Sequence, residues 1–167
     1  MSIVTVTNVL SKDECEKIME HGVMQSEDAK KNVLGTAWEP VRQLLALGTG
    51  RAVARFVMGN NLYAQVHWEC LEQRFLSYEV GYGCGFHIDG NMVKGNFVST
   101  ANIIIFLTDG IDREDGAICF PMQKLYVSAF AGSAVIFPTS WTHPHGVHPV
   151  KSPRFVLAGW LFNPIAS

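Results

Sequence analysis

The sequence has no marked excess of charge of either sign. Its 13 lysine and arginine residues face 15 aspartate and glutamate residues, so the formal net charge is −2, and the longest basic run is the pair Lys30-Lys31. Tight binding to nucleic acid depends on neutralising many phosphates with clustered basic side chains. We therefore expect no nucleic-acid partner.

Long apolar runs, a leader sequence and paired cysteines are also missing. The longest apolar runs, such as Ile103–Leu107, are far shorter than the roughly 20 residues that cross a bilayer, and Met1–Asn8 has neither a basic nor an apolar leader region. The four cysteines, at positions 15, 70, 84 and 119, form no Cys-x-x-Cys pair. We expect reduced thiols, no thiolate zinc site, no membrane partner and a cytoplasmic location.

What the sequence does contain is ample material for a buried core. Hydrophobic residues make up 48% of its 167 residues and charged residues only 17%, which excludes a disordered or low-complexity chain. A chain of this length is typical of one domain. We expect residues 1–167 to form a single domain, with a helical N-terminal part at 1–60 and a β-rich core at 65–163.

Two helices are predicted in the first third of the chain. Ser11 to Glu14 fits a capping box, in which the Ser11 hydroxyl and the Glu14 carboxylate each accept a hydrogen bond from the other residue's backbone N–H. This helix should run to His21. Thr36 to Glu39 repeats the pattern before an apolar stretch, and Gly48 is expected to end the second helix.

Short runs rich in β-branched and aromatic residues follow from Gln65 onward, separated by glycines and prolines. The expected strands are Gln73–Tyr78, Val98–Leu107, Ala117–Phe120, Lys124–Ser128, Ala134–Phe137 and Phe155–Leu161. Because no helical pattern lies between them, they favour an antiparallel sandwich or barrel over a parallel sheet. The predicted fold class is mainly β with N-terminal helices (α+β), built around a jelly-roll core.

Histidines provide the first candidate site. His87-Ile88-Asp89 places an imidazole and a carboxylate two positions apart, which on a strand puts both on one face, with Ile88 packed on the other. Two histidines and one carboxylate around one face of a metal are typical of non-haem Fe(II) oxygenases. Chance alone gives about half a His-x-acidic match in such a chain, and His67-Trp68-Glu69 is a second one, so the surrounding sequence has to decide.

Further motifs surround His87 and Asp89 in a fixed order. They are Tyr78-x-x-Gly81, nine residues before His87; Asp115-Gly116-Ala117-Ile118-Cys119-Phe120; Gly132-Ser133-Ala134-Val135-Ile136-Phe137-Pro138; and His145-Gly146-Val147-His148-Pro149-Val150 with Arg154 nine residues after His145. With these motifs, residues 71–162 resemble the Fe(II)/2-oxoglutarate-dependent oxygenases of the prolyl 4-hydroxylase-like branch. The resemblance implies a double-stranded β-helix core, of the jelly-roll or cupin-like type.

The resemblance also implies the roles of individual residues. His87, Asp89 and His145 would be the catalytic metal ligands. Arg154 would pair with the distal carboxylate of 2-oxoglutarate, because a planar guanidinium suits a bidentate carboxylate contact. Tyr78 and Asn102 would add polar contacts to the same co-substrate.

Three details of these assignments come from neighbouring residues. His145 is preferred over His143 and His148 because only His145 has the family's spacing to the valines that follow; the other two would support the site or belong to the turn. Val156 stands where many relatives have a hydroxyl residue, and Phe106 or Ile105 stands where some have tyrosine. Prolines 149 and 153 bend the chain, so that His145 and Arg154 reach the same mouth of the barrel.

The predicted function is an Fe(II)- and 2-oxoglutarate-dependent dioxygenase that hydroxylates a prolyl residue of a peptide or protein, or a small amino-acid-like molecule, and releases succinate and CO2. The implied cofactors are Fe(II), 2-oxoglutarate and O2, with ascorbate as an optional addition. The carboxylate of Asp89 argues against halogenation. Two alternatives stay open: a non-catalytic jelly-roll metal-binding protein, and a cupin-like metalloenzyme that does not use 2-oxoglutarate.

The remaining predictions concern residues outside the motifs. Trp141 and Trp160 are expected in the core, and His67 and Glu69 on the surface or along the barrel wall. Residues 29–35 and 90–98 are expected to form the loops that select the substrate. The sequence leaves the oligomeric state open.

Overall fold

The computed structural model describes residues 2–59, 64 and 66–165. The helical elements are α1 (Lys12–Val23), α2 (Glu27–Lys30), the 3-10 helix η1 (Thr36–Val41) and α3 (Arg42–Met58). The strands are β1 (Val4–Val6), β2 (Glu69–Tyr78), β3 (Cys84–His87), β4 (Val93–Lys94), β5 (Phe97–Phe106), β6 (Ile118–Phe120), β7 (Leu125–Val127), β8 (Ala134–Pro138), β9 (His145–Val147) and β10 (Arg154–Pro164). The predicted boundary at residues 60–65 falls almost entirely outside the described residues, and the single domain stays a prediction.

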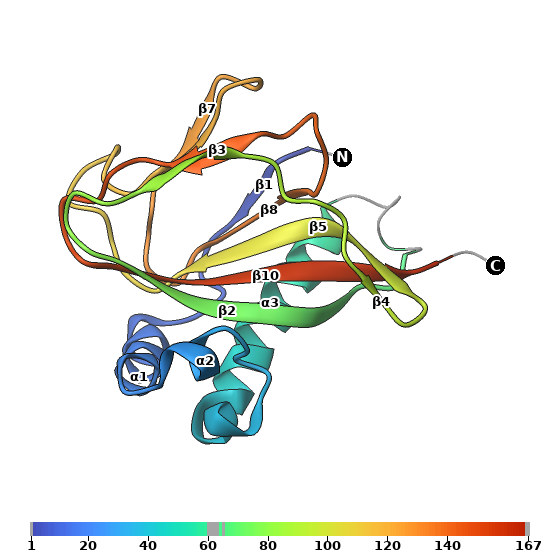
Figure 1. Cartoon of the computed structure of the whole chain (residues 1–167), viewed down its shortest axis with the longest axis horizontal. Coiled ribbons are helices and arrows are strands. Elements are labelled where there is room, and N and C mark those ends of the chain that lie inside the picture. The colour runs from blue at the N-terminus through green and yellow to red at the C-terminus, as the bar shows by residue number, and fades with distance from the viewer. Residues whose placement is uncertain (1, 60–63, 65, 166–167) are drawn as a thin grey trace.

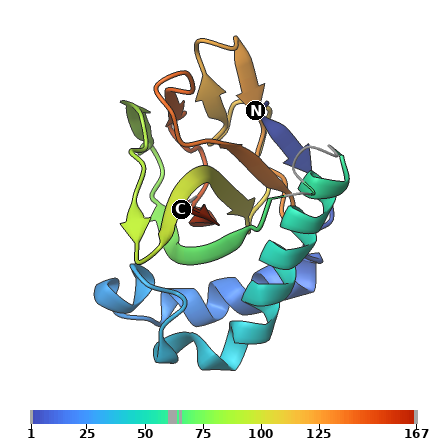
Figure 2. The same cartoon turned by 90° about the vertical axis from the view of Figure 1, so that its right-hand side faces the viewer.

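The strands form two antiparallel sheets that face each other. The major sheet has the order β1-β8-β5-β10-β2, with β4 paired to β5, and the minor sheet has the order β3-β9-β6-β7. The helices lie against the outer face of the major sheet, and the minor sheet lies over its inner face (Figures 1 and 2). This arrangement confirms the predicted fold class, a mainly β jelly-roll core preceded by helices.

The core is divided between the two faces of the major sheet. One cluster of buried side chains joins the helices to the sheet, and Ile18, Trp38 and Phe75 belong to it. A second cluster lies between the sheets and contains Phe106 and Phe137. Since β5 is buried on both faces, its apolar run is nearly continuous instead of alternating with polar residues.

The first predicted helix is confirmed. Ser11 Oγ accepts from the backbone N–H of Glu14 at 3.2 Å, and Glu14 Oε2 accepts from the backbone N–H of Ser11 at 2.7 Å, so both halves of the capping box are present. The helix ends at Val23, two residues beyond His21. The prediction therefore succeeded where the start of the helix depended on two local side chains.

The second predicted helix was wrong at both ends. Thr36 does not cap it; Gly35 is the N-cap without a side-chain hydrogen bond, and residues 36–41 form a 3-10 turn. Gly48 lies inside α3 and does not end it. A Cβ at Gly48 would lie 3.0 Å from the Leu10 side chain, so glycine allows close packing of α3 against the N-terminal segment.

Gly132 shows why one of the motif glycines is needed. Its φ is +77°, and a Cβ there would lie 2.1 Å from the carbonyl oxygen of Leu10. The Gly132 carbonyl accepts from the backbone N–H of Val9 at 2.8 Å. Only glycine permits this approach of the N-terminal segment to the start of β8.

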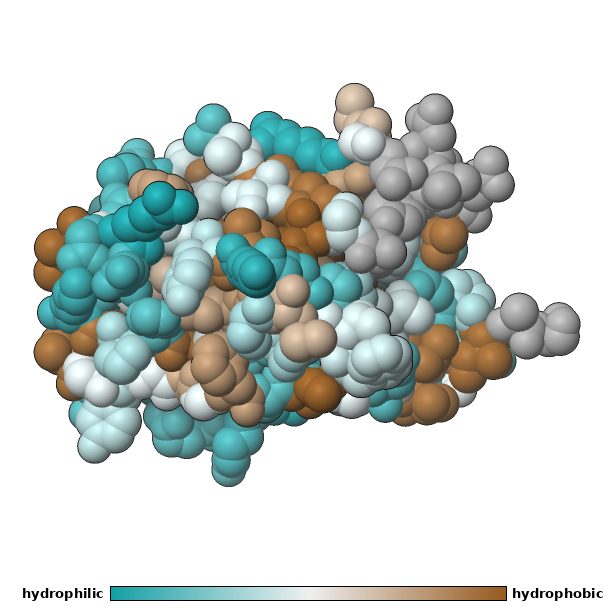
Figure 3. Space-filling view, turned by 90° about the horizontal axis from the view of Figure 1, so that it is seen from above, coloured by the Kyte–Doolittle hydropathy of each residue, from teal (hydrophilic) through white to brown (hydrophobic). Residues whose placement is uncertain are grey.

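The outer surface has no single dominant apolar area on the side above the minor sheet. Seen from there, apolar side chains form several small groups among polar ones (Figure 3). Among the helices that the structure describes, none is long and apolar enough to span a bilayer.

Candidate metal centre

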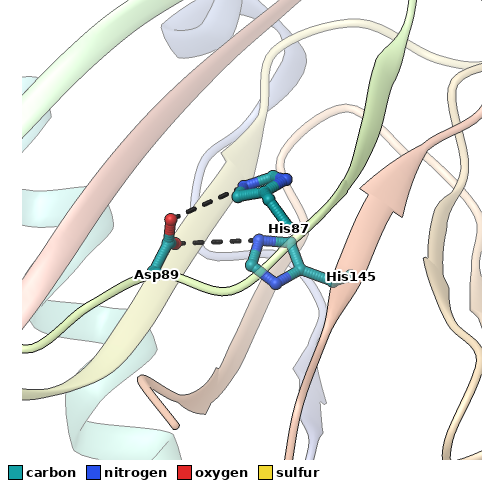
Figure 4. A group of neighbouring side chains, drawn as sticks. All are labelled: His87, Asp89 and His145. Atoms are coloured by element: carbon teal, nitrogen blue, oxygen red, sulfur yellow. Dashed lines mark ion pairs between the residues drawn. The ribbon is translucent and has the colours of Figure 1, made fainter. Parts of the chain in front are cut away.

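His87, Asp89 and His145 come together at one point between the sheets. Their candidate ligand atoms all lie within 4.8 Å of one another. Asp89 Oδ1 is 3.5 Å from His87 Nε2, and Asp89 Oδ2 is 3.7 Å from His145 Nε2, so the carboxylate faces both imidazoles (Figure 4). These are two nitrogens and one oxygen on one side of a shared space, the donor set of a facial Fe(II) site.

Strand pairing brings the two histidines together. His87 is the last residue of β3, and it pairs directly with His145, the first residue of β9. Asp89 lies beyond the end of β3, and Ile88 is 50% exposed. The prediction that both ligands lie on one strand, with Ile88 packed behind them, was therefore wrong, although both side chains still face one point.

Backbone carbonyls fix the orientation of both imidazoles. His87 Nδ1 lies 2.9 Å from the Gly85 carbonyl oxygen, and His145 Nδ1 lies 3.2 Å from that of His143. A carbonyl only accepts, so each Nδ1 carries the hydrogen and each Nε2 keeps a free lone pair. His143 thus supports the site through its backbone.

His145 is the buried member of the triad, with 4% relative exposure. Its ring centroid lies 4.6 Å from that of Phe137 and 5.9 Å from that of Phe120. Burial lowers the pKa of His145, so the imidazole is neutral at pH 7, as metal binding requires.

The triad opens into a cavity of about 200 Å³ between the two sheets. Apart from the three triad residues, the lining is Arg74, Leu76, Tyr78, Cys84, Asn102, Ile104, Val147, Ala158, Gly159 and Trp160. A smaller enclosed cavity of about 30 Å³ adjoins it, and Tyr78 and Val147 line both. A larger cavity of about 570 Å³ lies between α3 and β2, and none of the triad lines it.

Arg154 lies at the small cavity and not at the mouth that the sequence suggested. The first residue of β10, it is 1% exposed. Its guanidinium donates to the Thr108 carbonyl at 3.3 Å and to the Asp115 carbonyl at 3.1 Å, and Nη2 lies 3.1 Å from Asp115 Oδ2. Its Nε is buried without a hydrogen-bond partner among the described residues, which leaves one donor for a ligand.

The Asp115-Gly116 turn holds Arg154 in place. Asp115 is fully buried and also accepts from the backbone N–H groups of Ile111 at 2.8 Å and Lys151 at 2.6 Å. Burial opposes its ionisation, but these hydrogen bonds and the Arg154 charge outweigh it and lower the pKa of Asp115. A Cβ at Gly116 would lie 3.1 Å from Arg154 Nε, so glycine makes room for the guanidinium.

Tyr78 lies opposite Arg154 in the register of β2 and β10. Burial, followed by the nearby Cys84 thiol, raises the pKa of Tyr78 to about 12. The hydroxyl therefore stays protonated at neutral pH and is available as a donor. Phe106 and Val156 also line the small cavity, so the positions where relatives place hydroxyl residues are apolar here.

Asn102 is 2% exposed and lines the 200 Å³ cavity at the triad from β5. Neither its amide nitrogen nor its amide oxygen has a hydrogen-bond partner among the described residues. A buried amide without partners is costly, and it fits a site that receives a polar ligand.

Several predictions outside the triad were wrong. Trp141 is 76% exposed, and Trp160 lines the metal cavity, so neither is a core residue. Residues 29–35 pack on the helix side of the major sheet, where Val33 is buried and bonds to Gln73.

His67 and Glu69 pair with each other at 2.5 Å on the surface, as expected.

Arg74 is the cavity residue that sequence reasoning missed. It belongs to β2, four residues before Tyr78, and every second side chain of this strand faces the cavity. The alternation of Arg74, Leu76 and Tyr78 is the signal that could have identified it.

Comparison with known proteins agrees with this geometry. A family model described as the 2OG-Fe(II) oxygenase superfamily matches residues 74–162, more than half of the chain. The chain therefore belongs to this superfamily. A PKHD-type hydroxylase of Gloeothece citriformis is 35% identical over 92 residues, which are 52% of this chain and 40% of that protein, so this chain spans well under half of its length.

Solved structures with low sequence identity share the fold. The viral collagen prolyl hydroxylase vCPH of Paramecium Bursaria Chlorella virus-1, in its 2OG complex, has a TM-score of 0.74 and 15% identity, covering 97% of this chain and 96% of that one. A Pseudomonas putida prolyl-4-hydroxylase gives 0.65 and 17%, covering 95% and 86%. A Trichoplax adhaerens prolyl hydroxylase, in complex with a hypoxia inducible factor peptide fragment, gives 0.71 and 12%, covering 96% and 83%.

The residues present fit Fe(II) and 2-oxoglutarate. The triad supplies two imidazole nitrogens and one carboxylate, and the cavity beside it adjoins the small cavity at Arg154. The Asn102 amide and the Nε of Arg154 have no hydrogen-bond partner among the described residues. A dicarboxylate such as 2-oxoglutarate needs hydrogen-bond donors at each of its two carboxylates.

Proposed function

We propose that this chain is an Fe(II)- and 2-oxoglutarate-dependent dioxygenase that hydroxylates a prolyl residue of a peptide or protein, or a small amino-acid-like molecule. His87, Asp89 and His145 hold the metal as the catalytic ligands. Arg154, Tyr78 and Asn102 hold the co-substrate. Each turnover consumes O2 and 2-oxoglutarate and converts one C–H bond to C–OH, with release of succinate and CO2; ascorbate serves as an optional reductant.

One observation carries this proposal: the three ligand atoms lie within 4.8 Å of one another at the wall of a cavity that runs on to a buried arginine. A structural metal site is closed by protein ligands on every side, whereas this one has ligands on one side only. These three residues would hold Fe(II), and the bound metal would supply the activation of O2 that is coupled to oxidation of 2-oxoglutarate. The chain's part is to orient the co-substrate and to keep water out with apolar walls such as Ile104 and Val147.

The division of tasks follows from the layout of the cavities. Arg154 is four residues away from Ala158 on β10, and it lines the small inner cavity but not the cavity at the triad. The distal carboxylate of 2-oxoglutarate therefore lies deep, at Arg154 and Tyr78, and its keto acid end faces the triad. Asn102 lines the 200 Å³ cavity with the triad and donates to the same end.

The experiment that tests the proposal uses the optical band of keto-acid chelation. Anaerobic protein is mixed with Fe(II) and 2-oxoglutarate, the visible charge-transfer band is recorded, and succinate is measured after air is admitted. A band followed by succinate is expected. A folded protein that shows neither is a non-catalytic metal-binding jelly roll, and a metal-dependent activity without 2-oxoglutarate consumption indicates the cupin-like alternative.

A further inference from the structure

Arg74 is a basic residue of the metal cavity that the proposed function leaves without a task. Among the described residues that line this cavity, it is the one lysine or arginine. Its Nε is buried without a hydrogen-bond partner, and 43% of its side chain is exposed. The Arg74 side chain is thus partly accessible, and its Nε donor is unused by the residues that the structure describes.

The charge of Arg74 is not cancelled by its neighbours. Glu72 accepts from Arg74 Nη2 at 2.5 Å through Oε1, and its Oε2 lies 2.9 Å from Lys94 Nζ. One carboxylate therefore faces two cations. Although burial opposes its ionisation, Lys94 and Arg74 lower the pKa of Glu72, so the group of three keeps a net positive charge at neutral pH.

Trp160 lies beside the Arg74 guanidinium. Arg74 Cζ lies 4.8 Å from the centre of the Trp160 ring, and both side chains line the cavity. A guanidinium stacked on an aromatic ring keeps its edge free for hydrogen bonds. That edge suits a planar, bidentate anion.

Strand register separates Arg74 from the residues proposed to hold the distal carboxylate of 2-oxoglutarate. Tyr78 pairs with Arg154, and Arg74 pairs with Ala158. Four residues of strand correspond to about 13 Å. Arg74 lines the 200 Å³ cavity at the triad and not the small cavity, whereas Arg154 lines the small cavity and not the one at the triad, so the two guanidinium groups serve different parts of the site.

We propose that Arg74 binds a carboxylate of the substrate, so that the substrate is a small amino-acid-like acid and not an internal residue of a peptide. This inference rests on the proposed function and chooses between its two substrate classes. Within the lining that the structure describes, Asp89 is the one carboxylate, and the metal takes it. The positive charge of Arg74 is therefore left for an anion that enters after 2-oxoglutarate.

The experiment pairs each of the twenty common L-amino acids with its carboxamide. Each probe is added to anaerobic enzyme with Fe(II) and 2-oxoglutarate, the change in the charge-transfer band is recorded, and succinate is measured after air is admitted. We expect one or more free acids, and no carboxamide, to perturb the band and stimulate succinate release. In R74Q the half-saturating concentration of the active acid should rise about 10- to 100-fold, since hydrogen bonds to a charged group are lost.

K94Q is the matched control, because it removes the same charge beside Glu72 from a residue that does not line the cavity. It should change the half-saturating concentration by no more than about fivefold, as expected for an exposed ion pair. The affinity for 2-oxoglutarate should be the same in R74Q and in the unchanged protein. If R74Q folds poorly, R74K decides, since it keeps the charge, loses the planar fork and should bind the acid more weakly by about tenfold.

Three results would overturn the inference while leaving the proposed function intact: carboxamides or internal prolyl peptides that act as well as acids, no response to any acid, or an acid response that R74Q and R74K retain. Loss of 2-oxoglutarate binding in R74Q would assign Arg74 to the co-substrate and overturn it as well. Absence of the charge-transfer band in the unchanged protein would instead defeat the proposed function.

Discussion

The contribution of the Tyr78 hydroxyl to 2-oxoglutarate binding can be measured by replacing Tyr78 with phenylalanine. Its pKa of about 12 keeps it protonated, and it lies opposite Arg154. Y78F should raise the dissociation constant of 2-oxoglutarate about tenfold or more, because a hydrogen bond to a carboxylate contributes about 1.5–3 kcal/mol. Titration of the charge-transfer band measures this, and an unchanged constant would mean that the hydroxyl does not touch the co-substrate.

His145 should be indispensable for the metal, and His148 should not. H145A removes a buried ligand, so Fe(II) affinity should fall by more than about 100-fold, exceeding the 10- to 100-fold cost of losing an outer partner. H148A is the control, since the His148 ring faces Tyr126 and does not belong to the triad. Anaerobic calorimetry with Fe(II) checks both, and equal losses in the two variants would contradict the assignment.

Site residues differ in how well the sequence alone predicts that they belong to the site. His87 and Asp89 are close in the chain, and the motif around His145 has its own spacing, so their convergence was predictable. Arg74 belongs to no motif, and only its alternation with Leu76 and Tyr78 could have shown that it faces the cavity. Trp160 has no such signal, because its inward direction depends on the register of β2 against β10. Trp160 was therefore assigned to the core, since it lies in an apolar strand.

At the scale of elements, the turn before β6 links Asp115 to Arg154. D115N leaves the guanidinium buried without its charge partner and should lower the free energy of unfolding by about 3–5 kcal/mol near pH 7. The pKa of Asp115 is lower in the folded protein than its unfolded value of about 3.9. The contribution of this carboxylate is thus present above about pH 4 and lost as the pH falls through the lower folded value.

The pH dependence of this contribution is tested by urea unfolding. D115N and the unchanged protein are compared between pH 7 and the lowest pH at which both fold. The difference between them should shrink below about pH 4. A difference that does not vary with pH would show that the Asp115 hydrogen bonds, and not its charge, stabilise the turn.

Elements with a strong internal pattern were predicted, and elements defined by pairing were not. The capping box identified α1, and apolar runs identified β5, β8 and β10. Strands β1, β4 and β9 have three residues or fewer and were not among the expected strands. Strands β6 and β7 also have three residues, but they lie within the longer predicted runs Ala117–Phe120 and Lys124–Ser128. Without such a run, a short segment shows no period of two, and it becomes a strand only because a partner lies beside it.

At the scale of the whole molecule, the site joins two sheets that carry different parts of it. His87 and His145 belong to the minor sheet, whereas Tyr78, Asn102 and Arg154 belong to the major sheet. In the proposed function, the first group and Asp89 would hold the metal, and the co-substrate would contact both groups, through the metal and through Arg154. Fe(II) and 2-oxoglutarate, when bound together, should therefore act as a bridge between the two sheets.

This bridge predicts an order in the thermal stability of the protein. Under anaerobic conditions, 2-oxoglutarate alone should change the melting temperature little, because its metal-facing end lacks a partner. Fe(II) with 2-oxoglutarate at about 100 times the dissociation constant should add about 2.7 kcal/mol, or about 5–10 °C. R154A should keep the shift caused by Fe(II) and lose the further shift caused by 2-oxoglutarate, while a full shift from 2-oxoglutarate without metal would show that the two sheets are not joined in this way.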